Sequence, residues 1–365
     1  MNMYLEEKTP IQIILKLTGN DCNLNCTYCY EKKRQYDISD YMTFSTVEQL
    51  LYLLDDREIS IQLHGGEPLL YGLNNTREIL KMIKNTMKKI RVNVQSNGIL
   101  LNEEWLKLFC CEYPATEIGI SLDGDWIANT YRVDYQGINQ TNKIEHALQL
   151  CTKYKKGIGI ISVVNDKMIG REREVLEYFR QFPCIRGINF TPYYDFKIVS
   201  HNNSDTHGSI NIQEYHDFLK NIFLLWKTNV ERYKFIIDPF FNIIRSLLAK
   251  GTTSCHYSKF KCANMFTVYP NGELGCCDEI NTRYKNLGNI FEFHSIDDLI
   301  LKQKQHSLFR DAAEINKKCK GCKKIDICQE GCISSRLNFC DYSKEDEYCL
   351  ARCDLIDFVA DNLND

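Results

Sequence analysis

Cysteine is the residue type that most constrains this chain. The 365 residues contain 18 cysteines, which fall mainly in two groups. The first group is Cys22-x3-Cys26-x2-Cys29, and the second lies beyond Gly251. Residues 1–10 lack the apolar stretch and small-residue cleavage site of a secretory signal, so we expect a cytoplasmic protein. In that reducing compartment, grouped cysteines more often bind metal or perform chemistry than form disulfides.

The remaining composition is that of an ordinary soluble protein. Basic residues number 45 and acidic residues 48, which gives a formal net charge of -3. No excess of positive charge points to nucleic acid, and no run of about eighteen apolar residues predicts a membrane span. The length suggests two domains, and the composition shifts near Gly251. We therefore expect one domain at 1–250 and another at 251–365.

Strand-like and helix-like segments alternate through the first two-thirds of the chain. The strand candidates are short, rich in Ile, Val or Leu, and flanked by Gly, Asn or Asp. They are Ile11–Leu17, Ile59–His64, Arg91–Gln95, Glu117–Leu122, Ile158–Val164 and Gly187–Thr191. The helix candidates are Ser45–Asp56, Thr76–Lys89, Glu103–Cys111, Asn139–Lys155 and Arg171–Gln181, then, after a loop at His201–Gly208, Ile212–Lys227 and Pro239–Lys250. Ser45 and Thr46 are the expected N-caps of the first helix. Six such repeats predict an α/β fold with parallel strands in an open or closed barrel, whose sites lie at the carboxyl ends of the strands.

The first cysteine loop follows the first predicted strand. Iron–sulfur clusters are normally held by four cysteines, so three leave one iron open for another ligand. The C-x3-C-x2-C loop resembles the signature of the radical S-adenosylmethionine (SAM) superfamily, and Tyr30 fits the aromatic residue usual just after it. The resemblance implies a partial (β/α)6 TIM-like barrel, a four-iron cluster on the three loop cysteines and a cofactor contact from Tyr28. It also implies cleavage of SAM to a 5′-deoxyadenosyl radical that abstracts a hydrogen atom from the substrate. The alternative is a zinc knuckle, which would need a fourth ligand nearby, and the next histidine is His64.

Further predicted strand ends carry short motifs of the same superfamily. Gly65-Gly66-Glu67-Pro68 resembles the segment that holds the amino group of the methionine moiety, where the glycines let backbone approach a ligand closely. Gln95-Ser96-Asn97-Gly98 resembles the "QTNG" segment of the peptide- and protein-modifying branch, and Ser121-Leu122-Asp123-Gly124 with Arg132 resembles its "SLDG…R" segment. The resemblance implies that Ser121 contacts the ribose or carboxylate of the cofactor, and that Arg132 contacts its carboxylate or the substrate. Ordinary loop capping is the alternative, and Asp-Gly is a common turn pair. The expected cofactor-binding residues outside the cysteine loop are Gly65, Gly66, Glu67, Pro68, Ser96, Asn97, Ser121, Asp123 and Arg132.

The second cysteine group has its own spacing pattern. It reads Cys262-x9-Gly272-x4-Cys277, a gap, Cys319-x2-Cys322-x5-Cys328-x3-Cys332, a second gap, and Cys349. The pattern resembles the SPASM domain, which binds auxiliary four-iron clusters. Two clusters need eight cysteines, and Cys255 is the natural eighth. The resemblance to sulfatase-maturing enzymes implies a first auxiliary cluster on Cys255, Cys262, Cys277 and Cys332 and a second on Cys319, Cys322, Cys328 and Cys349. A pair of zinc sites is the alternative.

Seven cysteines lie outside these patterns. They are Cys110, Cys111, Cys151, Cys184, Cys276, Cys340 and Cys353. Free cysteine commonly packs as a small buried hydrophobic residue, and we expect this of most of them. Cys276 and Cys353 neighbour predicted ligands and could replace Cys277 and Cys349.

Asp278 directly follows a predicted cluster ligand. In sulfatase-maturing enzymes, an aspartate after the corresponding cysteine is proposed to deprotonate the substrate, whose cysteine or serine is oxidised to formylglycine. The resemblance therefore implies that Asp278 is a catalytic base. A solvated turn residue is the alternative.

Four functions fit these motifs. The first is a radical SAM maturase of a ribosomally made peptide, because the His64-Gly-Gly-Glu-Pro form occurs in peptide-cross-linking groups. The others are an anaerobic sulfatase-maturing enzyme, a small-molecule radical dehydrogenase and a non-catalytic zinc-binding adaptor. The first two imply SAM, three four-iron clusters, a peptide or protein substrate, and a flavodoxin or ferredoxin as electron donor. Only about ten residues precede the first strand, so we expect any peptide-recognition domain to be a separate protein or to be unnecessary. No nucleic acid or membrane partner is expected.

Overall fold

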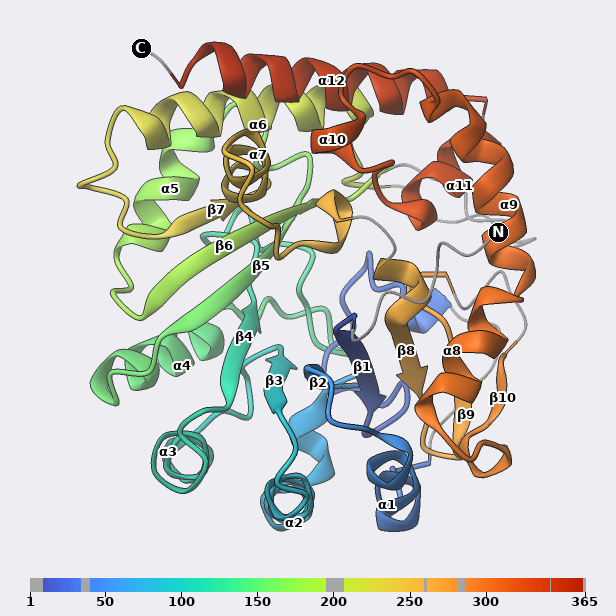
Figure 1. The fold of residues 1–365 in the computed structure, drawn as a ribbon. Coiled ribbons are helices and arrows are strands. Elements are labelled where there is room, and N and C mark those ends of the chain that lie inside the picture. The colour runs from blue at the N-terminus through green and yellow to red at the C-terminus, as the bar shows by residue number, and fades with distance from the viewer. Residues whose placement is uncertain are drawn as a thin grey trace. The chain divides into compact units, whose positions relative to one another are not determined.

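The computed structural model describes residues 9–33, 40–194, 207–258, 261–280, 286–341 and 343–363 (Figure 1). The chain divides into two compact units. The first comprises residues 1–120, 133–156 and 260–310, and the second comprises residues 121–132, 157–259 and 311–365. The boundary near residue 250 stays a prediction about domains. None of the described helices combines the length and apolarity needed to cross a membrane.

A mostly parallel sheet forms the centre of the first unit. Its strands are, in spatial order, β10 (Gly288–Asn289), β9 (Glu273–Gly275), β8 (Met265–Val268), β1 (Ile11–Lys16), β2 (Ile59–His64), β3 (Ile90–Ser96) and β4 (Glu117–Ser121). Strand β8 runs parallel to β1. Strand β9 is antiparallel to β8, and β10 is antiparallel to β9. The segment from Cys262 to Cys277 therefore contributes β8 and β9 to the sheet whose strand β1 precedes the first cysteine loop.

The helices of the first unit are the first four that the sequence predicts and a fifth that it did not predict. They are α1 (Phe44–Leu53), α2 (Leu73–Asn85), α3 (Glu103–Lys107), α4 (Thr141–Lys153) and α8 (Ile296–Lys304), with short helices η1 (Glu31–Lys33), η2 (Pro68–Tyr71), η5 (Lys261–Asn264) and η6 (Ile290–Glu292). The predicted helix at 103–111 is α-helical only to Lys107 and continues as the π-helix η3 (Leu108–Glu112).

The N-cap prediction for α1 is wrong. Thr43 is the cap, because its Oγ1 accepts the N–H of Thr46 at 3.2 Å and its backbone is extended. Ser45 and Thr46 lie inside the helix, where their own N–H groups need acceptors.

The second unit contains the later β/α repeats and the last cysteines. Its strands β5 (Ile158–Val164), β6 (Ile185–Pro192) and β7 (Ile236–Asp238) are parallel, and the sequence did not predict β7. Its helices are α5 (Glu172–Arg180), α6 (Ile212–Lys227), α7 (Phe240–Leu247), η4 (Cys255–Tyr257), η7 (Asn316–Cys319), α10 (Ile325–Cys328), α11 (Ile333–Asp341) and α12 (Glu345–Asp361). Helix α9 (Ser307–Ile315) begins in the first unit and ends in the second.

Most of the predicted loop at 201–208 lies outside the described residues. The α/β class and all six predicted strands are confirmed.

Apolar packing joins the C-terminal helices to the rest of the second unit. Helix α12 lies along α6 (Figure 1). Ile212 of α6, Phe339 of α11 and Tyr348 and Ala351 of α12 form one buried apolar cluster. Fully burying one large apolar side chain contributes about 1.5–3 kcal/mol. The cysteine-rich segment therefore has an apolar core of its own besides any metal it binds.

His216 makes the stability of the second unit sensitive to acid. Burial lowers the pKa of its imidazole from 6.5 to about 4, and its Nδ1–H donates to the carbonyl of Ile212 at 2.8 Å. The unfolded chain binds a proton at this histidine below about pH 6.5, whereas the folded chain binds it only near pH 4. Folding stability is therefore lost as pH falls through this window, by on the order of 3 kcal/mol. We expect urea unfolding of His216→Gln to depend less on pH between 6.5 and 4 than that of the wild type. The exposed His146, replaced by glutamine, is the matched control and should leave the wild-type profile unchanged.

Candidate active site

The cysteine loop after β1 packs backbone to backbone against the loop after β2. Gly66 N–H donates to the carbonyl of Gly19 at 2.9 Å, and Glu67 N–H donates to that of Asp21 at 2.8 Å. A Cβ on Gly66 would lie 2.1 Å from the Asp21 carbonyl oxygen, so only glycine fits there. A close approach does require these glycines, as expected, but it is the approach of one loop to another. The two amides are used in holding the loops together.

The three loop cysteines form a compact set of thiols in the first unit. All three are partly exposed, and Tyr28 lies half-buried in the turn between the last two. Cys22 accepts the N–H of Leu24 at 3.4 Å, and burial raises the pKa of its thiol to about 12, with the neighbouring Cys26 and Cys29 adding to the rise. Thiols that repel one another's negative charge in this way suit a bound cation, which deprotonates them. The donor set therefore fits an iron–sulfur cluster with three protein ligands.

Glu67 ties the β2 loop to the end of β3. Its carboxylate is fully buried and accepts from Leu69 N–H at 2.9 Å, Ser96 Oγ at 2.8 Å and Asn97 N–H at 2.7 Å. Burial raises the pKa of this carboxyl to about 7. Asn97 in turn approaches Cys22, with its Nδ2 3.7 Å from the Cys22 Sγ. The structure therefore brings the predicted Glu67, Ser96 and Asn97 together beside the first cysteine. Pro68, also predicted, is buried at the start of η2.

The remaining predicted cofactor contacts lie in the second unit. Ser121 ends β4, and Asp123 and Arg132 form a buried ion pair with Nε 3.1 Å from Oδ1. Asp123 Oδ1 also accepts the N–H of Val163 at 3.0 Å. Asp123, which follows β4 and bonds β5 at Val163, thus holds Arg132 in place. Their role toward the cofactor stays a prediction.

A buried charge cluster surrounds the ammonium group of Lys16, at the end of β1. Its Nζ lies 2.9 Å from Asp278 Oδ2 and 3.1 Å from His64 Nδ1, and it bonds the carboxylate of Glu31. Tyr30 donates its phenol O–H to the same Asp278 oxygen at 2.7 Å. Lys16 is fully buried, and Glu31 and Asp278 are nearly so. Burial alone would raise the pKa of the Asp278 carboxyl, but the charges of Lys16 and His64 and the hydrogen bonds from Tyr30 and Lys16 together outweigh it and hold that pKa below the usual range.

Sequence reasoning found Asp278 but missed its partners. Lys16 is a charged residue at the end of a strand that is otherwise almost entirely apolar, and that was the available signal. Glu31 follows the cysteine loop directly. A buried ammonium group needs anions close by, so a carboxylate partner from elsewhere in the chain was to be expected.

Replacing Lys16 should destabilise the first unit strongly. In Lys16→Met, the Glu31 and Asp278 carboxylates would remain buried without their shared cation, which costs about 3–5 kcal/mol. We expect a matching loss in the free energy of unfolding, measured by urea titration under anaerobic conditions. Lys81→Met is the control, since Lys81 pairs with Glu78 on the exposed surface of α2 and should matter little. Equal stability of the two variants would contradict the role of Lys16.

The cysteines predicted for the first auxiliary cluster are divided between the units. Cys262 and Cys277 belong to the first unit, and Cys255 and Cys332 to the second. Cys276 is buried, which raises the pKa of its thiol to about 12, whereas Cys277 is partly exposed next to Asp278. Of these two neighbours, Cys277 is thus the one whose thiol is open to a metal.

The second auxiliary set lies wholly in the second unit and has an extra member. The thiol of Cys353 forms a hydrogen bond with the thiol of Cys322 and lies close to the thiols of Cys328 and Cys349. The thiol of Cys349 in turn lies close to that of Cys319. Cys349 and Cys353 are one turn apart on α12, which places both on one face. We call these five residues, Cys319, Cys322, Cys328, Cys349 and Cys353, the auxiliary thiol group. Four of them were predicted as ligands, and Cys353, which the sequence offered as an alternative to Cys349, lies close to them.

The other cysteines differ in exposure. Cys151 and Cys184 are buried, as expected of packing residues, and Cys110 is partly exposed. Cys111 and Cys340 are exposed, so only Cys151, Cys184 and Cys276 of the seven are buried, and the expectation that most of them are buried is wrong.

The sequence is similar to a known superfamily and to curated enzymes. Residues 17–182 match the family model of the radical SAM superfamily. The cysteine-type anaerobic sulfatase-maturating enzyme of Clostridium perfringens (strain 13 / Type A) is 29% identical over 353 residues, which cover 92% of this chain and 91% of that enzyme. The serine-type anaerobic sulfatase-maturating enzyme of Bacteroides thetaiotaomicron is 24% identical over 361 residues, covering 92% and 85%.

Solved structures share the fold over most of the chain. Native anSMEcpe with bound AdoMet and Cp18Cys peptide gives a TM-score of 0.75 at 24% identity, covering 97% of this chain and 100% of that one. Streptococcus suis SuiB bound to S-adenosylmethionine gives 0.63 at 15% identity, covering 90% and 74%.

Proposed function

We propose that this chain, a radical SAM enzyme homologous to the anaerobic sulfatase-maturating enzymes, oxidises a cysteine or serine side chain of a protein substrate to formylglycine. The observation that carries the proposal is Asp278, a buried carboxylate held beside Cys277 by Lys16 and Tyr30. The curated relatives that span about nine-tenths of the chain support it, because they are named for sulfatase maturation. A maturase of a ribosomal peptide, which the motifs alone favoured, has less support from these relatives.

Eleven cysteines would hold three four-iron clusters under this proposal. Cys22, Cys26 and Cys29 would hold the cluster that binds SAM. The first auxiliary cluster would use Cys255, Cys262, Cys277 and Cys332, and the second would use four members of the auxiliary thiol group, Cys319, Cys322, Cys328 and Cys349. When bound, the clusters and SAM supply a 5′-deoxyadenosyl radical that removes a hydrogen atom from the substrate carbon, and an acceptor for one further electron.

Asp278 accepts the proton that the substrate side chain must lose. Oxidation of a cysteine Cβ removes one hydrogen atom, one proton and one electron, and water then replaces sulfur to leave an aldehyde. Tyr30 and Lys16 orient the carboxylate, and their hydrogen bonds keep it ionised until a substrate thiol arrives. The carboxylate can take up a proton when a bound substrate displaces or rearranges one of these donors.

Lys16, Tyr30 and Glu31 also fix the end of the cysteine loop. Tyr30 and Glu31 follow Cys29 directly, and both reach the group around Lys16. The base and the cysteine loop are therefore positioned by one buried network within the first unit. Such a network limits movement of Asp278 relative to the loop.

One assay tests the proposed function. The protein is reconstituted with iron and sulfide without oxygen, then given reductant, SAM and a peptide containing the sulfatase motif Cys-x-Pro-x-Arg. We expect deoxyadenosine and a peptide mass that matches conversion of thiol to aldehyde, with the Ser-x-Pro-x-Arg peptide as a second substrate and an Ala-x-Pro-x-Arg peptide as the control. Deoxyadenosine without any change in the cysteine and serine peptides would overturn the formylglycine proposal and return the search to another peptide substrate.

A further inference from the structure

Two buried arginines donate hydrogen bonds to the auxiliary thiol group. Arg336 Nη1 lies 3.2 Å from Cys319 Sγ, and Arg352 Nε lies 3.4 Å from Cys328 Sγ. Hydrogen bonds and charge near cluster sulfurs are among the factors that set the reduction potential of an iron–sulfur cluster. The surroundings of the two guanidinium groups determine which of them brings a net charge to this site.

The charge of Arg336 is balanced by a carboxylate. Its Nη2 bonds Glu345, which also receives Lys318 Nζ at 2.7 Å. Its Nη1 bonds the side chain of Asn316 at 2.5 Å as well as Cys319. Arg336 is therefore part of a buried ion pair that packs next to the thiols.

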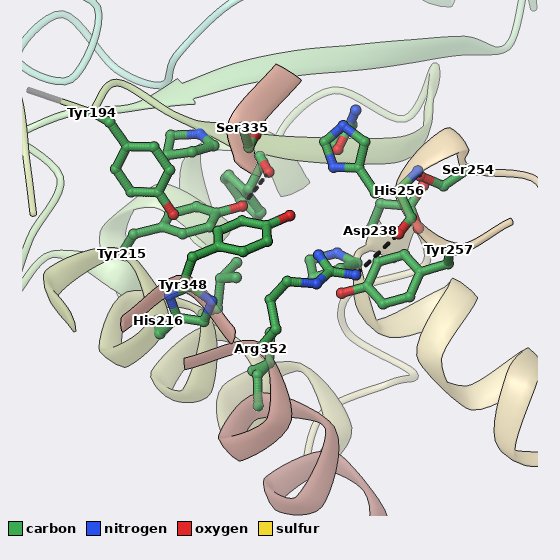
Figure 2. Close-up of a pocket in the computed structure, with 16 residues that line it drawn as sticks. Tyr194, Tyr215, His216, Asp238, Ser254, His256, Tyr257, Ser335, Tyr348 and Arg352 are labelled. Carbon is green, nitrogen blue, oxygen red and sulfur yellow. Dashed lines mark hydrogen bonds between the residues drawn. The ribbon is translucent and has the colours of Figure 1, made fainter. Parts of the chain in front are cut away.

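Arg352 has no such carboxylate. Its Nη2 donates to the carbonyl of His256 at 3.0 Å and, more weakly, to that of Cys328, and its guanidinium lies over the ring of Tyr257, 4.5 Å from the centroid. Among the residues that the structure describes, none forms a salt bridge with Arg352. Figure 2 shows the guanidinium between Tyr348 and Tyr257, with His256 above it. Among the described residues, the ionisable side chains that act on it are the phenols of Tyr257 and Tyr348 and the thiol of Cys328, and none of these is a carboxylate.

The pocket beside Arg352 is small. The pocket in Figure 2 has a volume of about 50 Å³, which is room for a few water molecules. Asp238 lines the same pocket, and its carboxylate bonds the amide of Asn242. Arg352 is nine-tenths buried, and a buried cation is costly unless a negative group compensates it. An iron–sulfur cluster on cysteine thiolates is an anion and would provide that compensation.

We propose that Arg352 is a positioning residue of the second auxiliary cluster, and that its Nε–H···S bond and uncompensated charge raise the reduction potential of that cluster. The inference rests on the proposed function in one respect: it takes the auxiliary thiol group to hold a four-iron cluster. A neighbouring cation favours the reduced cluster, which carries more negative charge, over the oxidised one. The potential is therefore higher with Arg352 than without it.

Arg352 also connects the cysteine segments of the two auxiliary sets. His256, whose carbonyl it bonds, directly follows Cys255, and Tyr348, one turn before it on α12, accepts the N–H of Cys332 at 3.1 Å. Both Cys255 and Cys332 are predicted ligands of the first auxiliary cluster. Arg352 thus holds segments from both sets in place while it contacts a sulfur of only the second. We therefore expect its charge to act mainly on the second cluster.

Redox titration followed by electron paramagnetic resonance tests this inference. The background is the full chain with Cys22, Cys26 and Cys29 replaced by alanine, which leaves only the auxiliary clusters. In Arg352→Gln we expect the reduction equilibrium constant of one auxiliary cluster to fall at least about tenfold, equivalent to about 59 mV for a one-electron couple, and that of the other to change less. Arg352→Lys keeps the charge and should recover part of the shift. Arg232→Gln, which removes an exposed arginine paired with Glu177 in the same unit, is the control and should leave both potentials unchanged.

The outcomes separate this inference from the proposed function. If the background protein binds no iron and sulfide on its auxiliary cysteines, the cluster assignment itself fails. If it binds two clusters and Arg352→Gln leaves both potentials unchanged, only the role of Arg352 is overturned.

A spectroscopic test covers the case in which Arg352→Gln does not fold. Protein labelled with ¹⁵N-arginine should show a nitrogen coupling to the reduced auxiliary clusters in pulsed double resonance. That coupling should be weaker in Arg352→Lys, which lacks Nε, while the contribution of Arg336 remains. Equal coupling in both proteins would overturn the proposed Nε–H···S bond.

Discussion

Cys26→Ala is expected to abolish deoxyadenosine formation by the reconstituted enzyme. Two thiolates on the loop, in place of three, would not hold a four-iron cluster with one open iron. The loop itself should persist, because the bonds that fix it run through backbone groups of Gly19, Asp21, Gly66 and Glu67. The loss should therefore be one of metal and of SAM cleavage rather than of the fold. Iron and sulfide content after anaerobic reconstitution measures the first loss, and deoxyadenosine formation measures the second.

Cys111→Ala is the matched control for this variant. Cys111 is an exposed cysteine in the same unit, on the π-helix η3 and outside every predicted ligand set. It should bind the same amount of iron as the wild type and form deoxyadenosine at the same rate. Normal deoxyadenosine formation by Cys26→Ala would remove the loop from the chemistry and revive the zinc-knuckle alternative.

The sequence predicted those parts of the site that lie in one short segment. The three loop cysteines, the Gly65–Pro68 motif and Ser96-Asn97 are each local in sequence, and the parallel strands bring them together at adjacent strand ends. Periodicity and flanking residues were enough to place all six strands of the repeats. The short strand β7 was missed because three residues give too little pattern.

Long-range partners could not be predicted in the same way. Lys16 and Asp278 are 262 positions apart and meet because β8 adds to the sheet beside β1, a pairing that no local pattern announces. Arg352 and Cys328 belong to different helices, α12 and α10, and meet because these two helices pack against each other. In each case the unexplained feature was a charged side chain within an otherwise apolar or cysteine-rich segment. Such a residue predicts a partner but not its position in the chain.

The glycine motif shows a second limit of sequence reasoning. Gly65-Gly66 is predicted to let a ligand approach the backbone, and the structure shows that Gly66 also lets the cysteine loop approach. The required property, a missing Cβ, is the same in both cases. The ligand contact stays a prediction. A motif therefore predicts the need for close contact more reliably than it predicts the identity of the group in contact.

Asp278→Asn is expected to stop substrate conversion while SAM cleavage continues without product. An amide of nearly the same size cannot take up the proton of a substrate thiol, and general-base catalysis contributes about 10²–10⁴-fold. Product formation should therefore fall at least about a hundredfold. Deoxyadenosine should still form, because Asp278 lies outside the loop that we propose to bind the first cluster. Peptide mass and deoxyadenosine are measured in the same reaction, so that the ratio of the two reports uncoupling.

Tyr30→Phe distinguishes loss of the base from loss of its surroundings. This variant removes the phenol that donates to Asp278 Oδ2 at 2.7 Å but leaves the carboxylate and its bond to Lys16. We expect a smaller fall in product than in Asp278→Asn and little uncoupling. If both variants lost product equally, the result would indicate that the network positions groups in the site and that the Asp278 carboxylate has no separate role as a base. If Asp278→Asn kept the product yield of the wild type, Asp278 would not be the base, and the proton would have to leave through another group near the substrate.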